Sequence, residues 1–163
     1  MALTRSDTAN GTTNLITTGF RSILIPVNTA QPELPCDMLD VAAYLATERR
    51  SSIVLLAFTE IPLWEEMDVE LPGLDDHVHA LATEARAIAL RFGVGVHVTA
   101  PRTRHAADQI LHEARRRKAE LIVLGATGRA RSDARALIDD GTIRRVSEEA
   151  GVRTLFVHAP CGP

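Results

Sequence analysis

Short, continuously apolar runs recur along the chain and are separated by stretches with helical spacing. The four runs lie at 21–27, 52–58, 120–124 and 153–158. Hydrophobicity without alternation is typical of strands that are buried on both faces of a parallel sheet. A fifth run, 94–100, alternates valines with Gly95, His97 and Thr99, which predicts a half-buried strand near a sheet edge.

Amphipathic helices are predicted between these strands. The strongest covers 74–92, where Leu74, Val78, Leu81, Ala85 and Ile88 recur at intervals of three and four before Gly93 ends the pattern. Weaker patterns predict helices over 35–49, 106–118 and 143–150. Strands that alternate with helices indicate an α/β fold, and right-handed crossovers give a single open, five-stranded parallel sheet with helices on both faces.

The domain organisation follows from where this pattern starts and stops. Residues 1–19 are rich in Thr, Asn, Gly and Ser without a clear period, which predicts a flexible N-terminal tail or linker. We expect one α/β domain over 20–159 and a short C-terminal tail over 160–163. A chain of 163 residues with 45% apolar residues can bury the core of one such domain.

Charge and cysteine content narrow the functional classes. A net charge of −3 gives no basic surface for nucleic acid. No signal-peptide pattern and no apolar run long enough to span a bilayer is present, so a soluble, cytoplasmic protein is expected. Cys36 and Cys161 are expected to be free thiols.

The chemistry is concentrated where the strand over 120–124 ends. Gly125, Ala126, Thr127, Gly128 and Arg129 follow it, and twelve residues separate Gly128 from Gly141-Thr142 at the start of a predicted helix. Glycines let backbone approach a ligand closely, and a helix N-terminus attracts anions, so the spacing indicates a phosphate loop. The alternative is that these glycines only let the chain turn.

The first strand ends in Pro26, Val27, Asn28 and Thr29. Ligands of open α/β sheets bind beyond the carboxyl ends of the strands, which makes Asn28 a candidate by position. A turn-capping Asn is an equally good interpretation.

The remaining polar features favour structural roles. The acidic segment 60–73 is interpreted as a solvated loop without metal-ligand spacing, and Trp64 within it as a plug against the sheet edge. No catalytic residue and no metal ligand is assigned, and without a P-loop lysine motif the protein is not expected to be an enzyme. Weak ATP hydrolysis is left open.

These residues resemble the universal stress protein family over Arg21 to His158. The resemblance rests on an ordered set of segments: 23–27, 53–56, 119–125, Gly141-Thr142 and 153–157. It implies a Rossmann-like fold and an adenine nucleotide, ATP or AMP, as the ligand, with Mg²⁺ accompanying ATP.

The resemblance also implies which residues bind that nucleotide. Gly125 and Gly128 would lie near ribose and phosphates, Gly141 and Thr142 at the phosphates, and the backbone of Ile53 at the adenine edge. The full implied set is Pro26, Val27, Asn28, Thr29, Ile53, Gly125, Ala126, Gly128, Arg129, Gly141 and Thr142.

Two departures from the family pattern concern this site. Asn28 stands where the family usually has Asp, and the spacing between Gly128 and Gly141 is longer than usual. Arg129 could grip phosphates across the longer loop, whereas Asp139 and Asp140 would repel a phosphate that they faced.

The resemblance implies a cytoplasmic stress-response domain that signals as a homodimer through Arg153 to Val157. The alternative is a dimerisation or interaction module that binds no nucleotide and regulates a membrane transporter, as in the related domains of some permeases and antiporters.

Overall fold

The computed structural model describes residues 3–6, 13–16, 20–30, 36–47, 51–126 and 138–158. Its centre is a six-stranded sheet in which β5, β4, β3, β7 and β8 follow one another and the short β6 pairs with β4. All pairs in this sheet are parallel. The strands are β3 (Ser22–Asn28), β4 (Ser52–Glu60), β5 (Gly95–Thr99), β6 (Arg102–Thr103), β7 (Leu121–Ala126) and β8 (Arg153–His158).

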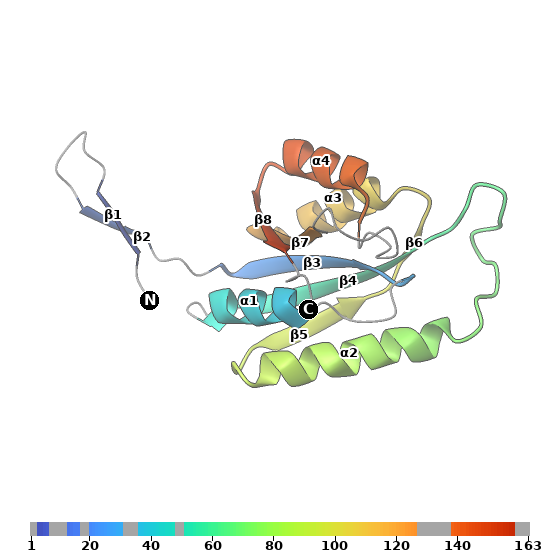
Figure 1. Cartoon of the computed structure of the whole chain (residues 1–163), viewed down its shortest axis with the longest axis horizontal. Helices are drawn as coiled ribbons and strands as arrows, with labels where there is room; N and C mark the ends of the chain where they lie inside the picture. The colour runs from blue at the N-terminus through green and yellow to red at the C-terminus, as the bar shows by residue number, and fades with distance from the viewer. Residues whose placement is uncertain are drawn as a thin grey trace.

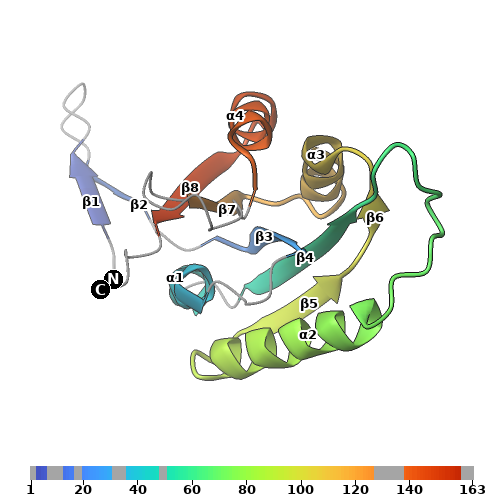
Figure 2. The same cartoon turned by 45° about the vertical axis from the view of Figure 1, so that its right-hand side comes forward.

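Two helical layers cover the sheet (Figures 1 and 2). On one face lie α1 (Cys36–Thr47) and α2 (Leu74–Leu90), and on the other lie α3 (Ala106–Arg116) and α4 (Asp140–Glu149). The α/β class and the order of the five main strands with their four helices are therefore confirmed.

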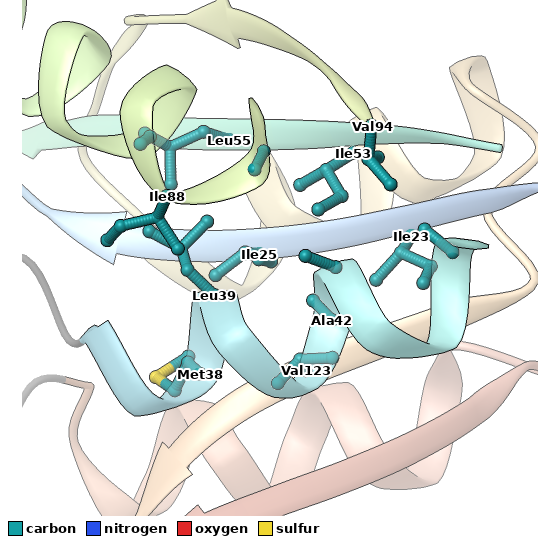
Figure 3. Close-up of a cluster of buried hydrophobic side chains, with 14 of the residues drawn as sticks. Ile23, Ile25, Met38, Leu39, Ala42, Ile53, Leu55, Ile88, Val94 and Val123 are labelled. Carbon is teal, nitrogen blue, oxygen red and sulfur yellow. The ribbon is translucent and has the colours of Figure 1, made fainter. Parts of the chain in front are cut away.

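The core explains why the strands are apolar on both faces. Towards α1 and α2, Ile23, Ile25, Ile53 and Leu55 pack against Leu39 and other helical side chains (Figure 3). Towards α3 and α4, the alternate strand residues, among them Leu24, Val54, Leu56 and Phe58, form a second buried cluster. Small helical residues such as Ala42, Ala85 and Ala107 let the helices lie close to the sheet.

The N-terminal segment, which is expected to be a flexible tail or linker, contains two short strands. β1 (Leu3–Ser6) and β2 (Thr13–Ile16) form an antiparallel two-stranded sheet separate from the central sheet. In Figure 1 this strand pair lies to one side of the α/β domain. Its pairing uses backbone groups over only four residues, too few to show a period in the sequence.

The connection between β4 and α2, residues 61–73, is called the strap below. It leaves the end of β4, arches outward and returns to α2 (Figures 1 and 2).

Within the described part of the chain, no helix is both long and apolar enough to cross a membrane.

Candidate functional site

The central strand β3 loses its neighbour on one side before it ends. Its pairing with β4 continues to Asn28, level with Phe58, whereas its pairing with β7 stops at Leu24, level with Ile122. β3 is also where the chain reverses its direction of winding, because β4 and β7 leave from opposite sides of it. Such a switch point is where open α/β sheets bind ligands.

Pro26 explains why the pairing with β7 stops there. The Thr29 N–H donates to the Phe58 carbonyl on β4 (2.9 Å), and the Ser22 carbonyl accepts from Glu120 beside β7 (2.9 Å). Because successive strand residues point their backbone groups to opposite sides, even-numbered residues of β3 face β7. Pro26 faces β7 and has no N–H to donate, so β7 is free to separate from β3 beyond this residue.

Asn28 closes the turn that follows β3. Its Oδ1 accepts from the N–H of Ala30 (2.9 Å), and its Nδ2 donates to Oε2 of Glu60 on β4 (3.2 Å). Next to it, the hydroxyls of Thr29 and Thr59 are 2.6 Å apart. The turn-capping interpretation of Asn28 is thus confirmed, and the amide also lies beside a carboxylate at the edge of the sheet.

A cavity of about 680 Å³ opens at this end of β3 and β4. Its volume is within the range typical of small-molecule sites. The strand ends supply its polar residues Asn28, Thr29, Thr59 and Glu60, and the strap and the start of α2 supply mostly apolar ones. The apolar lining residues include Ile61, Pro62, Val69, Leu71 and Leu74.

Sequence reasoning missed the contribution of β4 and of the strap. The signal that could have found it is Glu60, the first charged residue after a long apolar run, whose side chain accepts a hydrogen bond from Asn28. The apolar run predicts a strand that ends at Phe58, whereas β4 continues to Glu60.

Two arginines hold the strap over this edge. Arg102 donates to the carbonyls of Met67 (3.0 Å) and Val69 (2.6 Å), and Arg104 donates to those of Pro62 (2.6 Å) and Glu65 (2.8 Å). β6 brings them there, because Arg102 pairs with Thr59 of β4. The interpretation of Trp64 as a plug is wrong: its side chain is 84% exposed, since arginine–carbonyl bonds rather than aromatic burial fasten the strap.

On the other side of β3, Gly125 and Ala126 are the last two residues of β7 and pair with Val157 and His158 of β8. Gly128 and Arg129 lie outside the described residues. Gly141 and Thr142 are the second and third residues of α4. The structure therefore places the four described candidates of the glycine loop on β7 and α4, and none of these four residues lines the cavity.

The N-terminus of α4 is occupied by a side chain of the protein itself. Asp139 accepts from the N–H of Thr142 through Oδ1 (2.9 Å) and from the Thr142 hydroxyl through Oδ2 (2.6 Å). A Cβ atom added at Gly141 would meet Asp139 Oδ1 at 3.0 Å, so the glycine also makes room for this carboxylate. The hydrogen bond from the Thr142 hydroxyl, with help from backbone N–H groups, lowers the pKa of Asp139.

Ile53 is not brought together with the other candidates. It lies near the amino end of β4, is fully buried, and pairs with Ile23. The β4 residue level with Asn28 is Phe58, and the accessible residues that follow are Thr59 and Glu60. The register of the parallel pairing determines which β4 residue lies beside Asn28. An apolar run alone does not reveal that register.

No group of three or more His, Cys, Asp or Glu side chains that could hold a metal ion occurs among the residues described here.

Comparison with known proteins places the chain in a family. Residues 19–158 match the model of the universal stress protein family. No curated protein sequence matches the chain.

Solved structures share the fold at low sequence identity. A universal stress protein in complex with cAMP is 17% identical, covering 86% of this chain and 98% of that one, with a TM-score of 0.61. The protein from Archaeoglobus fulgidus in complex with dAMP is 16% identical, with 83% and 95% covered and a TM-score of 0.61. A family protein from Arabidopsis thaliana with AMP bound is 12% identical, with 86% and 92% covered and a TM-score of 0.54.

The family model spans the whole central sheet and its four helices, from just before β3 to the end of β8. The chain therefore belongs to the universal stress protein family.

Proposed function

We propose that this protein binds an adenine nucleotide at the carboxyl edge of its sheet and acts as a cytoplasmic regulatory domain. The observation that carries the proposal is the cavity at the carboxyl ends of β3 and β4, with Asn28 and Glu60 at its rim. Support comes from the similar structures whose names state that they contain cAMP, dAMP or AMP.

The cavity suits the base and the ribose. Its apolar strap residues can cover the faces of a planar base, and Glu60 can accept a hydrogen bond from the exocyclic amino group of adenine. Asn28 and Thr29 offer an amide and a hydroxyl for ribose hydroxyls. The carboxylate that the family usually has at position 28 is absent here, and Glu60 is the carboxylate that contacts Asn28 at this rim.

The α4 side favours a ligand with few phosphates. Asp139 already uses the N–H and the hydroxyl of Thr142 that a phosphate would need, and its carboxylate would repel a second anion there. We therefore propose a nucleoside monophosphate such as AMP rather than ATP with Mg²⁺. We propose that the protein binds this nucleotide and carries out no catalytic step on it.

The regulatory output proposed is a homodimer formed through β8. This strand is the last of the central sheet, and within the described chain no strand pairs with its outer edge. Phe156 on it is 41% exposed. Edge strands offer unpaired backbone groups to a second copy. Phe156→Asp should shift the sedimenting species from dimer to monomer, whereas Tyr44→Asp, at an exposed aromatic on α1, should not.

The binding proposal is tested by calorimetric titration of AMP into the wild type and two matched variants. Ala30 is exposed and lines the cavity, and Ala80 is exposed on α2 away from it. Ala30→Phe should fill the cavity and weaken binding by roughly a hundredfold, equivalent to about 2.7 kcal/mol. Ala80→Phe should leave it unchanged.

Absence of saturable binding to the wild type at millimolar AMP would contradict the proposal. The second candidate function, an interaction module without nucleotide that regulates a membrane transporter, would then take its place. The self-occupied N-terminus of α4 is the observation that favours that candidate.

A further inference from the structure

The strap concentrates exposed apolar side chains. Of the large hydrophobic residues that are exposed in the described part of the chain, four of seven lie on it. Leu63 and Trp64 are adjacent and are 76% and 84% exposed, and Met67 and Leu71 are exposed to a smaller degree. Scattered single exposed hydrophobics need no explanation, but a cluster on one segment indicates an interaction surface.

The strap presents these side chains on an anchored backbone. Arg102 and Arg104 together donate to four carbonyls spread from Pro62 to Val69. Turns within the strap add the bonds from the Glu65 N–H to Pro62 and from the Val69 N–H to Glu66. A surface that is ordered before binding loses less conformational entropy when a partner docks.

The strap is also strongly acidic, and its charges are not neutralised from within. Glu65, Glu66, Asp68 and Glu70 lie within six residues. No lysine or arginine occurs in the sequence between Glu60 and Ala85. The ion pairs among the described residues include none of these four carboxylates, because Arg102 and Arg104 bind backbone carbonyls instead.

We propose that the strap is a docking site for a cationic, amphipathic segment of a partner protein. The apolar side of that segment would cover Leu63 and Trp64, and its lysines or arginines would face the four carboxylates. Charge complementarity selects this partner, since the phosphates of nucleic acids and anionic lipids would be repelled. Glu65 and Leu71 also line the cavity, but Leu63, Trp64 and Met67 do not, so docking on these three side chains does not depend on nucleotide binding.

Trp64 is the one tryptophan of the chain, and its fluorescence reports directly on this surface. The probe is a synthetic peptide of leucine and lysine with leucines at helical spacing, and its matched control has glutamate in place of lysine. Titrating the full chain with the lysine peptide should shift Trp64 emission to shorter wavelength with saturation. The glutamate peptide should produce no shift.

Matched variants separate the strap from acidic surface in general. Glu65→Gln with Glu66→Gln should weaken binding of the lysine peptide by roughly three- to tenfold, since two exposed charge pairs are lost. Asp37→Asn with Glu148→Gln removes two exposed carboxylates from α1 and α4 and should leave the affinity unchanged. Leu63→Ser, with all strap charges kept, should also weaken binding.

Three results would overturn the proposal. Calorimetric binding of the peptide without a change in Trp64 emission would place the contact elsewhere. A shift that grows with protein concentration alone would assign the surface to a second copy of this chain. A shift on phosphatidylserine vesicles without peptide would assign it to a membrane.

Discussion

The two halves of the carboxyl edge differ in how their polar groups are satisfied. On the β3 and β4 side, Asn28 and Glu60 stand at the rim of a cavity of about 680 Å³. On the β7 and α4 side, Asp139 satisfies the first turn of α4 from within the chain. The cavity is therefore open on one half of this edge, whereas on the other half a carboxylate of the chain itself occupies the helix N-terminus.

The largest difference in AMP affinity is expected between a variant on the β3 side and a variant on the α4 side. Asn28→Ala removes the cap of the β3 turn and the amide beside Glu60, and it should weaken AMP binding by about tenfold or more. Thr142→Val should leave AMP affinity nearly unchanged, because the Thr142 hydroxyl is already used by Asp139. Calorimetry on both variants gives the comparison, and a greater loss in Thr142→Val would reverse it.

A second prediction concerns the strap as part of the cavity. Replacing Arg102 and Arg104 together by Ala removes four bonds to strap carbonyls. Hydrogen exchange over 61–73 should speed up by roughly tenfold, and AMP affinity should fall several-fold because the strap lines the pocket.

The control for this variant is Arg115→Ala, which removes an exposed arginine of α3 away from the strap. Unchanged exchange over 61–73 in the double variant would mean that the arginines do not fasten the strap.

The smallest expected effect is on the free energy of unfolding, and it tests whether Asp139 caps α4. Asp139→Ala removes the N-cap of α4 and should lower the free energy of unfolding by about 1 kcal/mol at neutral pH. Asp140→Ala, next to it, should have less effect. Denaturant unfolding of both variants measures the difference.

The pH dependence of that loss follows from the lowered pKa of Asp139. The folded protein keeps this carboxylate ionised to lower pH than the unfolded chain, in which the ordinary value of 3.8 applies. Its stabilisation is therefore complete above that value and is lost as the pH falls through the lowered one. The stability gap between wild type and Asp139→Ala should shrink only in acid, and a gap that persisted there would contradict the capping role.

Much of the fold could be predicted because buried apolar residues recur along the sequence with the spacing of a strand or a helix. The apolar runs and the helical spacing from Leu74 onward indicate the five main strands and their helices. The short β6 left no such record, because two residues cannot show a period. Its function is to place Arg102 and Arg104, whose partners are backbone carbonyls that carry no sequence signal.

Position along the chain predicts Asn28 as a candidate because it ends the first strand, and the structure places it at the cavity. Ile53 was misplaced because register, not hydrophobicity, sets which residues share an edge. Trp64 was misread because an aromatic residue in a loop usually packs, and here the strap is fastened in another way. The separation of β3 from β7 at Pro26 could not be predicted, because the sequence does not show which neighbouring strand a backbone N–H at this position would face.

The contrast between the open cavity and the self-capped helix is tested most directly by the ratio of AMP to ATP affinity. Calorimetric titrations would be made with the wild type and with Asp139→Ala. We predict that the wild type binds AMP at least as tightly as ATP. Asp139→Ala should then tighten ATP by about tenfold and leave AMP within about twofold. Tighter binding of ATP than AMP by the wild type, unchanged in Asp139→Ala, would contradict the account.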